Sequence, residues 1–208
     1  MTLGTALAVT LVAILVGVGT AILLVRPLRP STTMRPADVT LLDSLSWPQV
    51  ATDRFGRLVE LGTVVVLKVD LDHFSRVNTR LGRPAGDAVL AAAGSVILAQ
   101  AGRLGVAARL PGDQFALLVT AGRDDVDDLA RHIQREIGTL AARAAGHAGR
   151  PAVGRLTMSI GAAVYPGDGK TLDALMLAAD VLLLAAKNAG KDRVCVSRQA
   201  PDIESLAS

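Results

Sequence analysis

The stretch Thr63-Val-Val-Val-Leu-Lys-Val-Asp-Leu-Asp72 decides the fold of this chain of 208 residues. It is a nearly continuous apolar run rich in β-branched residues, which predicts a strand buried on both faces. Because side chains alternate along a strand, Asp70 and Asp72 should leave its end on the same side. An unpaired carboxylate at the edge of a core is costly, and a bound cation is one way to offset that cost. The alternative is that the two acids only mark the end of the strand.

The segments on either side of this strand predict an α+β domain. Residues 39–61 favour one or two short helices, interrupted at Pro48. Further helices are expected at Phe74–Leu81, from Asp87 to about Gln100, at Asp124–Ala145 and at Thr171–Asn188, and further strands at Val106–Leu110, Gln114–Thr120, Arg155–Tyr165 and Arg193–Ser197. Only Pro111-Gly-Asp113 separates two of these strands, which is typical of a tight turn in an antiparallel hairpin. A sheet with antiparallel pairs and helices around it follows.

Two ends of helices can be placed from single residues. Residues 82–86 are expected to form a loop, with Asp87 at the start of the next helix, where an acid favours the positive helix end. Gly190 is expected to cap the C-terminus of the last predicted helix.

The N-terminal residues 1–25 carry no charge and predict a transmembrane helix. Leu3 to Val25 gives about 34 Å of apolar helix, enough to cross a bilayer. A cleaved signal peptide is the less favoured alternative, because a basic start and a small-residue cleavage site are not evident. Basic residues follow the apolar segment, at Arg26, Arg29 and Arg35, so the rest of the chain should be cytoplasmic. We therefore expect a single-pass protein of the cell inner membrane.

The rest of the chain divides into three predicted parts. Residues 26–38 contain three prolines and form a short stiff linker, residues 39–198 form the globular domain, and residues 199–208 form a flexible tail. The single cysteine, Cys195, forbids an internal disulfide and fits a reducing compartment. With a net charge of +3 and 2% aromatic residues, the composition does not indicate nucleic-acid binding.

Several short motifs, in the same order and spacing, resemble the GGDEF diguanylate cyclase family. The resemblance runs from about Asp43 to Val196, and its motifs are Val69-Asp-Leu-Asp-His-Phe74, Val77-Asn78, Gly82, Gly86-Asp87, Arg109-Leu-Pro-Gly-Asp-Gln-Phe115, Thr157-Met-Ser-Ile-Gly161, Ala178-Ala-Asp180, Ala186-Lys187 and Gly190-Lys191. It implies a cyclase/palm-like fold, with a central, mostly antiparallel sheet wrapped by helices. It also implies that two subunits, each holding one GTP, face each other and form cyclic di-GMP with release of pyrophosphate.

The resemblance implies a role for each matching residue. Asp70, the backbone carbonyl of Leu71 and Asp113 would bind Mg²⁺ (or Mn²⁺), and Asp70 and Asp113 would be the catalytic acids. Residues implied to contact the substrate are Asn78 and Asp87 at the guanine, Gly112 in the signature turn, and Lys187 and Lys191 at the phosphates.

Taken alone, each of these residues has a simpler interpretation. Asn78 could end a short helix, Asp87 could cap one, and Asp113 could be a turn residue. Lys187 could be an ordinary basic residue near a helix C-terminus.

The chain departs from the family pattern at positions that matter for chemistry. Pro111 replaces the first signature glycine, which fixes φ and adds a ring where the family leaves space for nucleotide. Gln114 replaces an acid with a neutral amide, and Ser75 replaces a phosphate-contacting Lys. Gly102-Arg-Leu-Gly105 lacks the family's inhibitory product motif, so feedback binding there should be absent.

These departures favour a weak or inactive cyclase that binds GTP or a partner. Because the acids at 70 and 113 remain, an active diguanylate cyclase is the alternative. A scaffold that binds no nucleotide and only dimerises or docks at the membrane is a further possibility. The family's mechanism implies a homodimer, or a heterodimer with another GGDEF domain.

Overall fold

The structure is a computed structural model that describes residues 40–146 and 156–197. The predicted transmembrane helix, linker and tail lie outside these residues. The described elements are α2 (Trp47–Leu61), β1 (Val64–Leu71), α3 (Phe74–Leu81), α4 (Arg83–Ala101), β2 (Val106–Arg109), β3 (Gln114–Thr120), η2 (Arg123–Asp125), α5 (Val126–Gly146), β4 (Met158–Val164), α6 (Leu172–Asn188) and β5 (Val194–Val196).

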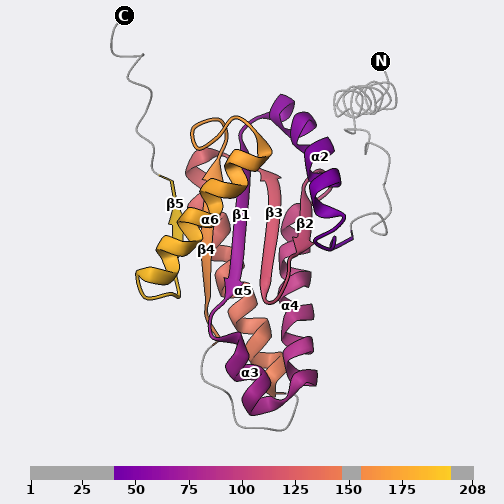
Figure 1. Cartoon of the computed structure of the whole chain (residues 1–208), viewed down its shortest axis with the longest axis vertical. Helices are drawn as coiled ribbons and strands as arrows, with labels where there is room; N and C mark the ends of the chain where they lie inside the picture. The colour runs from indigo at the N-terminus through magenta and orange to yellow at the C-terminus, as the bar shows by residue number, and fades with distance from the viewer. Residues whose placement is uncertain (1–39, 147–155, 198–208) are drawn as a thin grey trace, which may run out of the picture. The chain divides into compact units, whose positions relative to one another are not determined.

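The five strands form one mixed sheet in the order β2-β3-β1-β4-β5. The pairs β2–β3, β3–β1 and β1–β4 are antiparallel, and β4–β5 is parallel. The predicted central strand is therefore the middle strand of the sheet, and the β2–β3 hairpin lies beside the end of β1 that carries the acids (Figure 1). In this register Asp70 lies opposite Gln114 on one side and Ser159 on the other. The expectation of a mostly antiparallel α+β sheet is confirmed.

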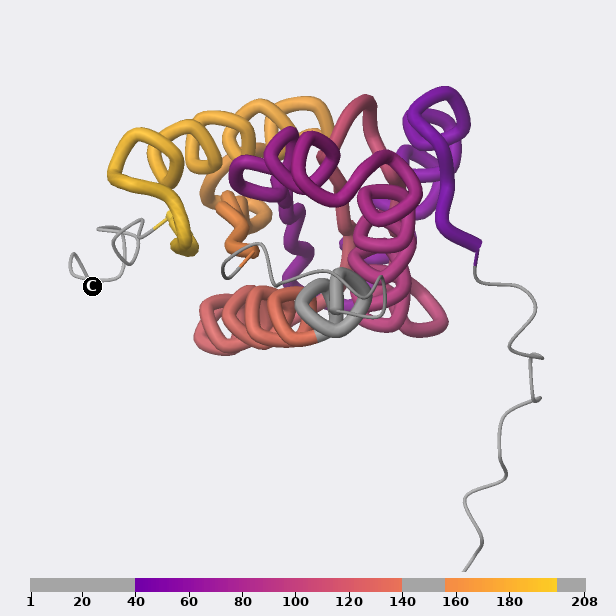
Figure 2. The backbone as a smooth tube through the Cα atoms, turned by 90° about the horizontal axis from the view of Figure 1, so that it is seen from below, coloured from indigo at the N-terminus to yellow at the C-terminus, as the bar shows by residue number. Residues whose placement is uncertain are grey.

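Both faces of the sheet are covered, as the apolar run of β1 predicted. Its odd-numbered residues pack in one buried cluster with residues of α3, α4 and α5, while Val64 and Val66 pack in a second cluster with residues of α2 and α6. Figure 2 shows the strands between α6 on one side and α5 on the other. Every residue of β1 is buried, so the alternation assigns Asp70 to the face covered by α6.

Helix α6 lies unusually close to the sheet. A Cβ on Gly161 of β4 would overlap the backbone of α6 at Ala179 and Leu183. Two ion pairs of opposite polarity join β1 to α6: Lys68 Nζ lies 3.1 Å from Asp180, and Lys187 Nζ lies 2.6 Å from Asp70. The glycine allows the approach, and the ion pairs fix the position of the helix along β1.

One local prediction was wrong. Residues 83–86 are helical, because α4 begins at Arg83 with Gly82 as its N-cap and a proline in its first turn, where the missing N–H costs nothing. Asp87 therefore lies inside α4 and does not cap it. The expectation of one or two short helices in residues 39–61 is met by the single helix α2, which has Pro48 in its first turn.

Within residues 40–146 and 156–197, α4 is the one helix long and apolar enough to be considered as a membrane span. Half of that window is buried inside the domain, and its Val89, Ala93 and Ile97 belong to the core cluster with α5. Its composition is that of a core helix.

Candidate functional site

A pocket of about 340 Å³ opens where β1 ends, beside the hairpin turn and the C-terminal end of α6. Its lining residues come from these three places and from the start of α3: Asp70, Leu71, Asp72, His73, Phe74, Ser75, Asp113, Lys187 and Lys191. The structure thus brings together Asp70, Leu71, Asp113 and both lysines, which are distant in the sequence.

The β2–β3 turn brings Asp113 to the pocket through backbone contacts. The amide of Leu71 donates to the carbonyl of Asp113 at 3.3 Å, and the amide of Leu110 donates to the carbonyl of Gln114 at 2.9 Å. Gly112 adopts a φ of +78°, which favours glycine, and the side of its Cα where a Cβ would lie is open space. The turn is therefore shaped by the sheet register and by one glycine.

Asp70 is buried and already has two partners. Lys187 Nζ lies 2.6 Å from Asp70 Oδ2, and Gln114 Nε2 donates to the same oxygen at 3.0 Å. The amide must present its N–H₂ here, because its oxygen would face the carboxylate with like charge. Gln114 therefore acts as a donor to Asp70. The sequence had shown only that a neutral amide replaces an acid at this position.

The pKa of the Asp113 carboxyl reflects its partial burial and the acid beside it. Burial, followed by repulsion from Asp70, raises the pKa of the Asp113 carboxyl, while Lys187 lowers it. A cation between Asp70 and Asp113 would relieve that repulsion.

The pocket therefore fits a magnesium ion that takes part of its ligands from the protein and the rest from water and phosphates. Within the described residues no three His, Cys, Asp or Glu side chains converge on a ready-made metal site. Mg²⁺ is usually held by one or two carboxylates together with water and substrate phosphates, which is the donor set that Asp70, Asp113 and the Leu71 carbonyl offer.

Asn78 and Asp87 lie beyond the lining of this pocket. Helix α3 carries Phe74 and Ser75 at the pocket and Asn78 about one turn further on. A Cβ on Gly86 of α4 would overlap the Asn78 side-chain oxygen and crowd the Phe74 ring. Gly86 thus lets α4 approach Asn78 closely, and the neighbouring residue, Asp87, is exposed.

The two lysines come from the end of α6. Lys187 lies in its last turn, and the backbone then closes with two hydrogen bonds, from Gly190 N to Lys187 O at 3.3 Å and from Lys191 N to Ala186 O at 3.1 Å. This pair of bonds around a positive-φ glycine is the Schellman motif, so Gly190 does terminate the helix as expected. Lys191 Nζ lies 3.3 and 3.4 Å from the two ring nitrogens of His73.

Asp72 shares the pocket with Asp70, but protein donors occupy it. Its Oδ1 accepts from Ser159 Oγ at 2.8 Å, and its Oδ2 accepts from Thr157 Oγ1 at 2.8 Å and from Asp192 N at 3.0 Å. Of the two acids at the end of β1, Asp72 therefore binds neighbouring segments of the protein. Thr157 and Ser159 belong to a motif noted in the sequence, but nothing in the sequence linked them to Asp72.

A sheet of this order, with acids at the end of its middle strand beside a hairpin turn, defines a cyclase/palm-like domain. Residues 54–193 match the sequence model described as "Diguanylate cyclase, GGDEF domain", so the chain belongs to the GGDEF family. This confirms the resemblance drawn from the sequence motifs.

Relatives and solved structures agree with this assignment. The chain is 37% identical over 131 residues to the bifunctional diguanylate cyclase/cyclic di-GMP phosphodiesterase MucR of Pseudomonas aeruginosa, covering 62% of this chain and 18% of MucR. The GGDEF domain of YfiN (TpbB) from the same organism is 26% identical, with a TM-score of 0.62 and coverage of 78% of this chain and 99% of that domain. The GGDEF domain of DgcB from Caulobacter crescentus, solved with c-di-GMP, shares the fold at a TM-score of 0.64, 23% identity and coverage of 81% and 100%.

The chain spans only a small part of the first curated relatives it matches, from 16% to 18% of their length. The similarity therefore concerns the GGDEF domain of those proteins.

Proposed function

We propose that this GGDEF domain binds GTP with magnesium or manganese and is a weak or inactive cyclase in cyclic di-GMP signalling. The observation that carries the proposal is the double occupation of Asp70 Oδ2, by Lys187 Nζ at 2.6 Å and by Gln114 Nε2 at 3.0 Å. The acid that should hold the metal is neutralised by a lysine and blocked by an amide that stands where the family has an acid.

The consequence for catalysis is electrostatic. A metal that approaches Asp70 must compete with Lys187 and Gln114 for the same oxygen, and position 114 adds no negative charge to attract it. Phosphoryl transfer depends mainly on positioning and on charge neutralisation by the metal, so weaker metal binding lowers the rate directly. Held by Asp70, Asp113 and the Leu71 carbonyl, the ion would supply positive charge that screens the phosphates.

The features that favour nucleotide binding are retained. Lys187 and Lys191 line the pocket and offer two cations to phosphates. Asn78 and Asp87 offer an amide and a carboxylate on neighbouring turns of α3 and α4, where Gly86 brings the two helices close. These groups can pair with the edge of a guanine.

An active diguanylate cyclase, in which two GTP condense to cyclic di-GMP, is the second candidate. It is favoured by one observation, the placement of Asp70 and Asp113 at the same pocket. In that case Lys187 would have to leave Asp70 and contact the phosphates instead. A nucleotide-free dimerisation or membrane scaffold is a third candidate, to which a failure to bind GTP would point.

We further propose that the domain is attached to the cell inner membrane by one helix within residues 1–25 and faces the cytoplasm. The support is the uncharged apolar segment followed by Arg26, Arg29 and Arg35. Homodimers, or heterodimers with another GGDEF domain, are the partners that the two-GTP reaction requires.

The test is to incubate the full-length chain with GTP and either Mg²⁺ or Mn²⁺, while measuring GTP affinity and cyclic di-GMP formation together. Binding with little or no product is the expected result. Turnover at rates typical of enzymes, about 1 s⁻¹ or more, would establish the active cyclase. If no GTP binding is detected, the remaining candidate is the nucleotide-free scaffold.

A further inference from the structure

Asp72 is buried, and it has no role in the proposed metal and nucleotide contacts. Its side chain is 4% exposed, and its three donors, the hydroxyls of Thr157 and Ser159 and the amide of Asp192, are all uncharged. A carboxylate held by neutral donors binds them more strongly than a neutral acceptor does. Asp72 therefore holds in place the chain segments that supply these donors.

Two of the donors belong to the start of β4, but the third lies in the turn from α6 to β5. That turn contains three successive residues with positive φ: Gly190 at +112°, Lys191 at +65° and Asp192 at +47°. For residues other than glycine the left-handed region is unfavourable, although aspartate tolerates it better than lysine, so Lys191 in particular needs neighbouring contacts that hold the turn.

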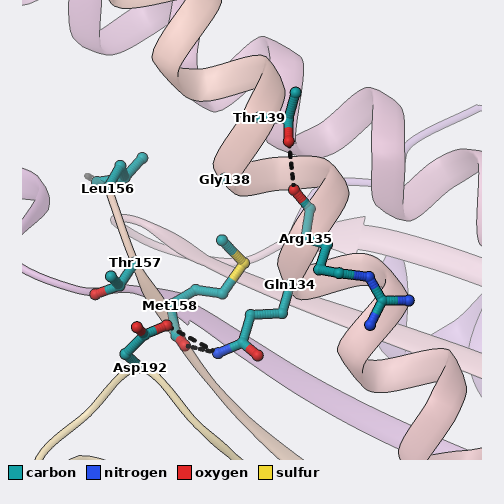
Figure 3. A pocket seen from close by; sticks show the side chains of 8 residues that line it. All are labelled: Gln134, Arg135, Gly138, Thr139, Leu156, Thr157, Met158 and Asp192. Atoms are coloured by element: carbon teal, nitrogen blue, oxygen red, sulfur yellow. Dashed lines mark hydrogen bonds between the residues drawn. The ribbon is translucent and has the colours of Figure 1, made fainter. Parts of the chain in front are cut away.

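Asp192 is held from two sides. Asp72 Oδ2 accepts its backbone N–H at 3.0 Å, and Gln134 of α5 donates from Nε2 to its Oδ1 at 3.1 Å. Gln134 Nε2 also donates to the carbonyl of Met158 at 3.2 Å, which fixes the amide against β4. Figure 3 shows Gln134 reaching from its helix to Asp192 and Met158. We call Asp72, Gln134 and Asp192 the Asp192 tether.

The residue directly before Asp192 is Lys191, which lines the pocket. Its backbone is in the same left-handed turn, and its Nζ lies beside the ring of His73, the residue that follows Asp72. His73 itself has a φ of +56°. Asp72 thus precedes His73 in the chain and binds the residue that follows Lys191, and the His73 and Lys191 side chains contact each other.

We propose that Asp72 is a positioning residue that, together with Gln134, holds the α6–β5 turn so that Lys191 is presented to the phosphates of the nucleotide. The phosphate contact rests on the proposed GTP-binding function. The positioning of the turn does not, and it can be measured without any ligand.

The first measurement is amide hydrogen exchange over residues 189–193 in the full-length chain without nucleotide. Asp72→Ala should speed exchange in this turn about tenfold or more, because the acceptor of the Asp192 amide is gone. Asp72→Asn is the rescue variant: its Oδ1 can accept from Thr157 and Asp192, while its N–H₂ can donate to Ser159 Oγ. Ser159→Ala is the matched control, since it removes a hydrogen bond of Asp72 but leaves the Asp192 contact. Both should stay within about threefold of the unmodified chain.

The second measurement is a double-mutant cycle on GTP affinity. Lys191→Ala should weaken GTP binding about tenfold, and Asp72→Ala about fivefold, with Asp72→Asn close to the unmodified chain. If Asp72 acts through Lys191, Asp72→Ala should change affinity less than about twofold once Lys191 is already Ala. General destabilisation would instead lower affinity equally in both backgrounds.

The outcomes separate the two proposals. No GTP binding by the unmodified chain overturns the proposed function, and hydrogen exchange still decides whether Asp72 holds the turn. Equal exchange in Asp72→Ala and Ser159→Ala, or equal losses of GTP affinity in both backgrounds, overturns the positioning role. If Asp72→Ala does not fold, Gln134→Ala takes its place, because it releases the other side of Asp192 from a half-buried surface position. Unchanged exchange in that variant then overturns the tether.

Discussion

Replacing Gln114 by Glu should make the stability of the domain depend on divalent cations. Gln114 Nε2 now donates to Asp70 Oδ2 at 3.0 Å, next to Asp113. A glutamate at this position would lose that hydrogen bond and place a third acid against Asp70 and Asp113. Lys187, at 2.6 Å from the same oxygen of Asp70, offsets only part of the added charge.

The size of the effect can be bounded in two ways. Two like charges about 3 Å apart repel by roughly 5 kcal/mol at an effective dielectric constant of about 20. The carboxyl can avoid this by taking up a proton, which at pH 7 costs about 3.7 kcal/mol for a glutamate. After the partial compensation by Lys187, we expect Gln114→Glu to lower the free energy of unfolding by about 2 kcal/mol without metal. For a chain of this length that is roughly 4–8 °C in Tm.

The assay is thermal unfolding of both chains in EDTA and in millimolar Mg²⁺ or Mn²⁺, with cyclic di-GMP formation measured in parallel. The loss in EDTA should be recovered with the divalent ion, and the metal-induced rise in Tm should be larger in the variant. Gln49→Glu makes the same chemical change at an exposed position of α2 and should show neither effect. The reasoning is refuted if Gln114→Glu is as stable as the unmodified chain in EDTA and gains no more from metal.

Three other predictions concern the Asp113 carboxyl and the close packing at Gly161 and Gly86. Because burial and then Asp70 raise the pKa of Asp113 above 3.8, the group binds its proton more tightly in the folded state, and its contribution to stability falls as pH rises from 3.8 through the raised folded value. Asp113→Asn should therefore raise the free energy of unfolding at pH 7, by less than about 1 kcal/mol because the group is partly exposed. This gain should vanish below pH 3.8 in a series of thermal melts. Gly161→Ala forces a methyl group into the backbone of α6 and should destabilise the chain by about 3 kcal/mol in urea unfolding; a loss below about 1 kcal/mol would contradict this packing. Gly86→Ala displaces the Asn78 side chain and should reduce the preference for GTP over ATP about tenfold in competition binding, whereas unchanged selectivity would separate Asn78 from guanine recognition.

The central strand could be predicted because its sequence leaves little choice. The run Val64-Val-Val-Leu67, near the start of the stretch that ends on the two acids, is too apolar for a surface and too β-branched for a favoured helix. The hairpin followed from Pro111-Gly112 between apolar runs, since those residues favour a turn and little else. The boundaries of α3 followed from its own apolar spacing and from the glycine after it.

The start of α4 could not be predicted, because its glycine has a tertiary purpose. Gly82 and Gly86 flank a proline and are typical of a loop, yet the helix begins at Arg83. Gly86 is needed inside the helix because Asn78 of α3 occupies the space of its missing side chain. Local propensity reports the loss of helix stability at a glycine and says nothing about which neighbour requires it.

The sequence by itself determined the buried strand, the acids at its end, the turn beside it and the family to which the chain belongs. Only the tertiary structure decided what each polar group contacts: Asp70 with Lys187 and Gln114, and Asp72 with Thr157, Ser159 and Asp192. The physical reason is that alternation places both carboxylates on one face, while the donors that reach them come from strands and helices far along the chain. Hydrogen bonds and ion pairs act over about 3 Å, so the packing of β4 and α6 against β1 sets the role of each acid.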